Sequence, residues 1–220
     1  MTWREWFENA LAKYPTPWKY LFEAQEYMRP VMQAATRWCP PPANVLEAGC
    51  GIGMTAMAFA AEGYGVSGID IDKEVLHLAG GLPWFDELPG CVVSRDDMVG
   101  LCIGEAMLVE YLTHAIAFSG GVIEHEDSED RISLLRALKI AAHVQIVVIP
   151  SPLQLALAPD RAEMGEQPIP LSDLIQLCCH AGWNVVESFG FGAPGPKVVN
   201  IGDYEPWMSL CVVGRNANAA

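Results

Sequence analysis

The sequence predicts an α/β fold in which helices cover both faces of a mostly parallel, doubly wound sheet. Between residues 44 and 150, five apolar segments with the length of strands alternate with helical segments. The segment 143–150 has VQIVVI at its centre, and a strand that is apolar throughout is typical of the middle of a parallel sheet. Two more strand-like segments follow near the carboxyl end, at 184–190 and 207–214, which gives seven strands in all.

Residues 1–38 precede the sheet and are expected to form two helices. Thr2 can cap the first helix, because Glu5 follows it by three residues, the spacing of a capping box. Prolines at positions 15 and 17 end this helix. The second helix is expected from Trp18 to Trp38, with an interruption near Pro30.

The chain is expected to hold one globular domain with a helical appendage. A length of 220 residues suits one domain and allows a sizeable core. Three consecutive prolines at 40–42 fit neither a helix interior nor a sheet ladder, so they separate the two parts. We therefore predict an N-terminal helical cap at 1–39 and the main domain at 40–216.

The clearest functional pattern is carried by the first two strands and the helix between them. A strand, a glycine turn, a helix and a second strand are expected at 44–48, 49–53, 54–62 and 65–71. Glycine at alternate positions lets the backbone approach a ligand closely, and the free amides of the helix face the turn. Asp70 follows Gly49 by 21 residues, the place where a carboxylate holds a ribose diol. The segment therefore predicts a site for an adenosine-containing cofactor.

Two details of the turn indicate what kind of cofactor this is. A dinucleotide fingerprint needs its third glycine at position 54, where this chain has Met54. Glu47 precedes the turn, and a carboxylate beside the site disfavours a pyrophosphate and suits a cation. The turn therefore favours a cationic nucleoside over a nicotinamide dinucleotide.

The pattern E-x-G-C-G-x-G at 47–53, followed by G-I-D-I-D at 68–72, resembles the first two motifs of class I S-adenosylmethionine-dependent methyltransferases. The resemblance covers about residues 40–216. It implies a Rossmann-like, doubly wound, seven-stranded sheet with one antiparallel edge strand. It also implies S-adenosyl-L-methionine as methyl donor and S-adenosyl-L-homocysteine as product.

The same resemblance implies roles for the residues around the turn. Glu47 would lie near the methionine ammonium of the cofactor, Asp70 would hold the ribose hydroxyls, and Ile71 would pack on the adenine. The turn residues that would make room for the cofactor are Gly49, Cys50, Gly51 and Gly53.

Two later segments resemble further parts of this family. CVVSRDD at 91–97 is expected to be the third strand, after which Asp97 and Met98 would recognise the adenine edge. SGGVIEH at 119–125 follows the fourth strand, and Ser119 and Gly120 would border the methionine moiety.

Candidate catalytic residues come from two places. His125 is the candidate general base, since it follows the fourth-strand loop and an imidazole titrates near neutrality; alternatively, it only fixes the loop. In the aromatic N-terminal segment, Tyr14 and Tyr20 are the residues expected to reach the methyl donor or acceptor. The alternative is that these rings anchor the helices to the core.

Composition limits the acceptor and the partners. The formal net charge of −14 and the absence of a basic cluster argue against DNA or RNA. No apolar run is long enough for a membrane helix, and the N-terminus lacks the pattern of a secretory signal. Seven scattered cysteines without C-x₂-C spacing suit reduced thiols in the cytoplasm and predict no metal site. We expect a small-molecule acceptor and a cytoplasmic monomer or homodimer.

Two other functions stay open at this point. A binding module could keep the cofactor pocket, lose catalysis, and act as a sensor or partner subunit. A nicotinamide-dependent oxidoreductase is disfavoured by Met54 and Glu47. Oxygen, nitrogen, sulfur and carbon acceptors are all compatible with the sequence.

Overall fold

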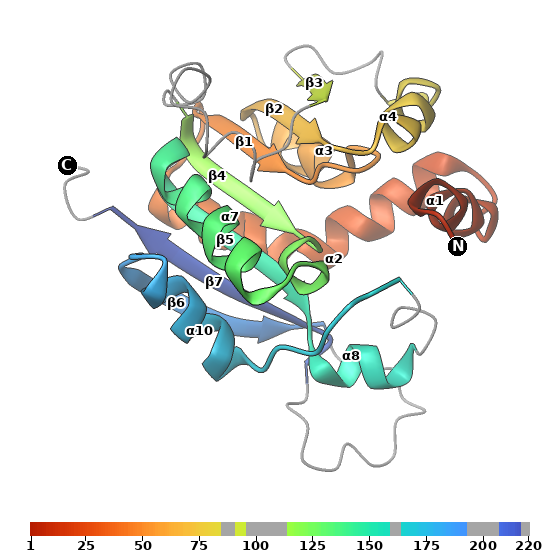
Figure 1. Cartoon of the computed structure of the whole chain (residues 1–220). Helices are drawn as coiled ribbons and strands as arrows, with labels where there is room; N and C mark the ends of the chain where they lie inside the picture. The colour runs from red at the N-terminus through yellow and green to blue at the C-terminus, as the bar shows by residue number, and fades with distance from the viewer. Residues whose placement is uncertain (85–90, 96–113, 159–163, 193–206, 217–220) are drawn as a thin grey trace.

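In the part of the chain that the structure describes, seven strands form one sheet in the order β3-β2-β1-β4-β5-β7-β6. The computed structural model describes residues 1–84, 91–95, 114–158, 164–192 and 207–216 (Figure 1). All pairs from β3 to β5 are parallel, whereas β7 is antiparallel to both of its neighbours. The strands are β1 (Asn44–Ala48), β2 (Gly65–Asp70), β3 (Cys91–Arg95), β4 (His114–Gly120), β5 (Ala142–Pro150), β6 (Val185–Phe191) and β7 (Ser209–Arg215).

The mostly parallel α/β fold is confirmed, but the prediction that the antiparallel strand lies at the edge is wrong. β7 lies between β5 and β6, with Val147 opposite Val212, and β6 forms the edge. The burial of the two strands gives the reason. β7 is buried from Ser209 to Gly214, whereas most of β6 is partly exposed. An apolar strand buried along its length needs neighbours on both sides, so β7 takes the inner place.

The first N-terminal helix, α1, spans Trp3–Ala12 and begins as expected. The Thr2 hydroxyl accepts a hydrogen bond from the Glu5 amide at 3.2 Å, and the Thr2 amide donates to the Glu5 carboxylate at 2.8 Å. The predicted capping box is therefore confirmed.

The second helix, α2, spans Pro17–Trp38 and has Thr16 as its N-cap. The predicted interruption near Pro30 is wrong, because the helix continues through that residue. Proline removes one helical hydrogen bond, but the next turn contains Val31 and Met32, which are buried in the core. Packing of this face compensates for the lost bond.

The other helices lie on both faces of the sheet. They are α3 (Met54–Ala61), α4 (Lys73–Gly80), the short 3₁₀ helix η1 (Ile123–His125), α7 (Ser128–Ala141), α8 (Pro152–Leu157) and α10 (Leu171–His180). Helices α7 and α10 cover one face, and α2 and α3 pack on the other (Figure 1). No helix of the described residues is both long and apolar enough to cross a membrane.

Two of the described helices follow β5 in the chain. Helix α8 comes directly after the strand, and the Ser151 hydroxyl caps it by accepting from the Gln154 amide at 3.1 Å. Helix α10 begins at Leu171 after Pro170, so Ser172 lies inside its first turn and is not its N-cap. In α7, Ile140 is 49% exposed.

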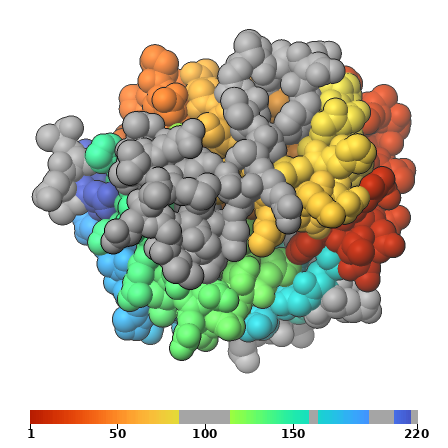
Figure 2. Space-filling view, turned by 45° about the horizontal axis from the view of Figure 1, so that its top comes forward, coloured from red at the N-terminus to blue at the C-terminus, as the bar shows by residue number. Residues whose placement is uncertain are grey.

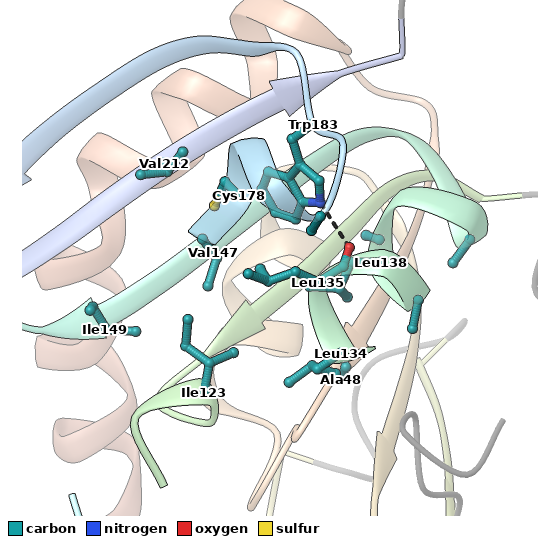
Figure 3. Packing of buried hydrophobic residues seen from close by; sticks show 14 of the residues in the cluster. Ala48, Ile123, Leu134, Leu135, Leu138, Val147, Ile149, Cys178, Trp183 and Val212 are labelled. Carbon is teal, nitrogen blue, oxygen red and sulfur yellow. Dashed lines mark hydrogen bonds between the residues drawn. The ribbon is translucent and has the colours of Figure 1, made fainter. Parts of the chain in front are cut away.

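Two of the buried apolar clusters form layers on opposite faces of the sheet. Along β1, Val45 packs with α2 and α3, whereas Leu46 packs with α7 and α10, as the two-residue period of a strand requires. Trp183 lies in the layer that contains α7 and α10. It donates its indole N–H to the carbonyl of Leu135 at 2.8 Å (Figure 3). This bond satisfies a buried polar group and joins α7 to the segment after α10.

Candidate functional site

A cavity of about 400 Å³ lies at the carboxyl ends of the central strands. Ala48 ends β1, Asp70 ends β2 and Gly120 ends β4, and all three residues line the cavity. The strand order runs outward from β1 in one direction through β2 and in the other through β4. This is the topological switch point, where doubly wound sheets bind their ligands.

The glycine turn forms one wall of this cavity. Gly49 and Gly51 line the cavity, and with Gly53 they have φ angles of 75°, 53° and 77°. A Cβ atom on Gly49 would lie 2.2 Å from Cγ2 of Val122, and one on Gly51 would lie 2.9 Å from Cζ of Phe7. The turn therefore needs glycine for both its backbone conformation and its close contacts.

Asp70 connects the second strand to this turn. Its Oδ2 accepts a hydrogen bond from the Gly51 amide at 2.8 Å, and its Oδ1 accepts one from the Asp72 amide at 2.9 Å. Burial raises the pKa of Asp70, and these amide bonds oppose that rise. A carboxylate can accept about four hydrogen bonds. Asp70 can therefore hold the turn and still accept from hydroxyls in the cavity.

Glu47 is a buried carboxylate in the wall of the same cavity. It is 3% exposed, and its Oε2 has no hydrogen-bond partner among the described residues. Burial raises the pKa of Glu47 to about 8, with a smaller rise from Asp70, against the opposing effects of the Ala56 amide and the Thr55 side chain. A cation placed in the cavity would stabilise the ionised form of this side chain.

Helix α1 covers the cavity with aromatic side chains. Trp3 and Phe7 line it, and the Trp3 ring lies edge-on to the ring of His125 with centroids 4.8 Å apart. Arg4 forms an ion pair with Glu74 at 3.3 Å, which joins α1 to α4. In the space-filling view the red N-terminal segment lies beside yellow α4 (Figure 2). The aromatic composition of residues 1–22 was the sequence signal for this cover.

The structure brings most of the expected cofactor residues together. Ile71 lines the cavity and is 62% exposed. Gly53 caps α3 and Ser119 is fully buried in β4, and neither lines the cavity. The expected residues that do line it are Glu47, Gly49, Cys50, Gly51, Asp70, Ile71, Gly120 and His125. Asp97 and Met98 lie outside the described residues.

The two tyrosines proposed from the sequence lie away from this cavity. The rings of Tyr14 and Tyr20 pack against each other with centroids 5.0 Å apart, and neither residue lines the cavity. This position matches the alternative of aromatic packing more closely than a role in binding.

His125 also lines the cavity. Its Nδ1 lies 3.1 Å from the carbonyl oxygen of Met164, and its Nε2 lies 3.9 Å from Oε1 of Glu166. Both ring nitrogens therefore face groups of the protein. A general base must come within about 3.2 Å of the proton that it takes, so this role would require the ring to leave these contacts.

Two buried carboxylates accompany His125. Glu124 is fully buried and Glu166 is 6% exposed. No sequence motif marks Glu166, which lies between α8 and α10. Tertiary folding alone brings it to His125.

Among the comparisons with known proteins, only the comparison with solved structures finds matches, and these concern the fold. No protein-family model matches the sequence, and no curated protein matches it. Among solved structures, magnesium protoporphyrin IX methyltransferase from Synechocystis PCC 6803 with bound S-adenosylhomocysteine matches at a TM-score of 0.64 and 14% identity, over 90% of this chain and 84% of that chain.

Two further structures give similar values. An S-adenosylmethionine-dependent methyltransferase from Mesorhizobium loti has a TM-score of 0.61 and 15% identity, over 86% of this chain and 98% of that chain. A protein from a study of the conversion of a disulfide bond into a thioacetal group during echinomycin biosynthesis has a TM-score of 0.62 and 18% identity, over 86% and 83%. At such low identities, the likeness concerns the arrangement of the backbone.

Proposed function

Because the chain has the fold of class I S-adenosylmethionine-dependent methyltransferases, we propose that it binds S-adenosylmethionine and transfers the methyl group to a small-molecule acceptor. One observation carries this proposal. The cavity at the switch point combines a left-handed glycine turn, a carboxylate at the end of β2 and a buried carboxylate at 47. These groups match a nucleoside that carries a diol and a cationic end.

In this proposal the ribose and the ammonium of the cofactor each meet a residue of matching chemistry. The ribose hydroxyls donate to Asp70, which the Gly51 and Asp72 amides hold in place. The ammonium of the methionine moiety lies near Glu47, whose buried Oε2 is an acceptor within the cavity wall. Glycine at 49 and 51 leaves room for the cofactor to pass along the backbone.

Bound S-adenosylmethionine supplies an electrophilic methyl group on a sulfonium, which the acceptor displaces in line. The protein contributes mainly proximity and orientation to such a step. Trp3 and Phe7 line the cavity and would limit the access of water to a bound cofactor, which strengthens electrostatic contacts inside. Their aromatic faces also suit a cationic centre.

The size and charge of the protein support a small acceptor. The cavity of about 400 Å³ lies in the size range of small-molecule sites, and α1 lies over it. A formal net charge of −14 disfavours the phosphate backbone of a nucleic acid. One structural neighbour is named for a methyl transfer to magnesium protoporphyrin IX, which is also a small molecule.

Calorimetric titration tests the proposal. We expect the wild-type protein to bind S-adenosylhomocysteine at one site per chain and to bind NADH much more weakly. Transfer of a radioactive methyl group from S-adenosylmethionine to the small-molecule fraction of a cell extract would establish turnover. Preference for NADH, or label that appears only in macromolecules, would contradict the proposal.

A further inference from the structure

Three possible metal ligands meet beside the cavity. They are the carboxylates of Glu124 and Glu166 and the imidazole of His125, and one ligand atom of each lies within 4.8 Å of the others. Glu124 and His125 belong to η1, directly after the loop that follows β4, whereas Glu166 lies between α8 and α10. The two segments are 41 residues apart in sequence, so the fold builds this cluster.

The tautomer of His125 can be worked out from its neighbour. Nδ1 lies 3.1 Å from the Met164 carbonyl oxygen, which can only accept, so Nδ1 carries the proton. In the neutral ring Nε2 then has a lone pair, and it points toward Glu166. A histidine that ligates a metal has this arrangement, with its other nitrogen donating to a carbonyl or carboxylate.

The spacing of the atoms also suits an ion. Nε2 lies 3.9 Å from Oε1 of Glu166, which is too far for a hydrogen bond. Zinc binds nitrogen and oxygen ligands at about 2.0–2.2 Å, so an ion between these two atoms could contact both. The ligand atoms of the three residues lie up to 4.8 Å from one another. A small movement of these side chains toward each other would let one ion contact all three.

Electrostatics favours a cation in the same place. Two carboxylates this close to each other and this deeply buried repel strongly in their ionised forms. The guanidinium of Arg131 packs on the same segment and donates to the Ile123 carbonyl and to the Gln167 side chain, both at 2.9 Å. A divalent ion among the ligands would offset the charge of both carboxylates.

The backbone around the cluster is already fixed. The Gln167 amide donates to the Glu124 carbonyl at 2.9 Å, next to the two bonds from Arg131. These bonds hold the ligand-bearing segments together before an ion arrives. A preassembled ligand set of this kind reduces the cost of binding.

From these observations we propose that Glu124, His125 and Glu166 form a binding site for one divalent transition metal ion, of the Zn²⁺ or Mn²⁺ class. Imidazole together with carboxylates suits these ions better than Mg²⁺ or Ca²⁺. The absence of paired cysteines does not bear on such a site. The ion would fix the ring of His125, which lines the cavity and contacts Trp3, and would leave coordination positions for water.

Metal titration tests the site without any methyl donor. The protein is treated with a chelator, dialysed, and titrated calorimetrically with Zn²⁺, Mn²⁺ and Co²⁺, the last also by visible absorption. We expect one ion per chain and a Co²⁺ spectrum of a nitrogen- and oxygen-ligated site. Glu166→Gln and Glu124→Gln should each weaken binding by at least about tenfold, since even outer partners of a metal site contribute that much.

Glu62→Gln is the matched control, because Glu62 is exposed at the end of α3, and it should leave metal affinity unchanged. Far-ultraviolet circular dichroism of each variant checks that it folds. The proposal is wrong if the wild-type protein takes up none of the three ions, or if neither cluster variant changes the affinity. Because S-adenosylmethionine is not involved, this outcome is independent of the proposed methyl transfer.

Discussion

The two walls of the cavity are built in different ways. The glycine-turn wall, at the ends of β1 and β2, comes from 24 consecutive residues, 47–70, and is fixed by backbone amides on Asp70. The histidine wall, after β4, is fixed by contacts of His125 and Arg131 with residues 164–167. The glycine-turn wall is made of residues that are close together in sequence. The histidine wall is made of segments that are distant in sequence and that only tertiary folding brings together. Substitutions in the two walls should therefore have separable effects.

Gly49→Ala should have the largest effect and should disable the glycine-turn wall. The φ of 75° is unfavourable for alanine, and the new Cβ would lie 2.2 Å from Val122. Strain and overpacking together predict a loss of about 2–5 kcal/mol in the free energy of unfolding and no measurable binding of S-adenosylhomocysteine. Urea denaturation and calorimetry measure both.

Gly63→Ala separates strain from crowding. Gly63 has a φ of 92°, but among the described residues an added Cβ would meet only Pro41, at 3.7 Å. The cost should be the conformational one alone, about 1–2 kcal/mol, with cofactor affinity unchanged. Equal losses in the two variants would show that the contact with Val122 has no importance.

Asp70→Asn should reduce cofactor affinity by an intermediate amount. The variant keeps the shape of the side chain but loses the charge-assisted bonds to the ribose, which predicts a loss of about 1–3 kcal/mol of binding free energy. Titration with S-adenosylhomocysteine measures it. Asp127→Asn is the control, since Asp127 caps α7 outside the cavity and asparagine caps as well as aspartate. Unchanged affinity in Asp70→Asn would refute the assignment.

Arg131→Met should weaken the histidine wall while sparing the glycine-turn wall. It removes the bonds to the Ile123 carbonyl and to Gln167 and keeps most of the aliphatic volume. We expect a loss of about 1–3 kcal/mol in the free energy of unfolding and little change in affinity for S-adenosylhomocysteine. A large loss of cofactor affinity would show that the two walls are coupled.

The smallest effect expected is a proton released on cofactor binding. The pKa of Glu47 is about 8, so the side chain is mostly protonated at pH 7, and a nearby ammonium would favour its ionised form. Binding at pH 7 should release up to about one proton, measured by calorimetry in buffers of different ionisation enthalpy. Glu47→Gln should release none, and a release that is unchanged in this variant would exclude Glu47 as its source.

The same group affects the stability of the protein without cofactor. Its folded-state pKa of about 8 lies above the unfolded value of 4.5, so the folded state binds the extra proton between these values. The contribution of Glu47 to the free energy of unfolding is fully present below about pH 4.5 and is lost as the pH rises toward 8. Denaturation of Glu47→Gln should show a smaller decline over this range than the wild type.

The sequence predicts the glycine-turn wall but not the contacts of the histidine wall. The order of strand, glycine turn, helix and Asp70 is local, and chain geometry places these residues together. The contacts of Phe7 with Gly51 and of His125 with Glu166 depend on how α1 and the segment before α10 pack. Periodicity does not specify such distant packing. The position of β7 inside the sheet was missed for the same reason.

The central claim is that the cavity holds S-adenosylmethionine across the ends of β1 and β2. A crystal structure of the protein soaked with S-adenosylhomocysteine tests it most directly. The account predicts density for the nucleoside over Gly49 and Gly51, with its ribose hydroxyls within hydrogen-bond distance of Asp70 and its amino group toward Glu47. Density elsewhere, or none at saturating concentration, would contradict it.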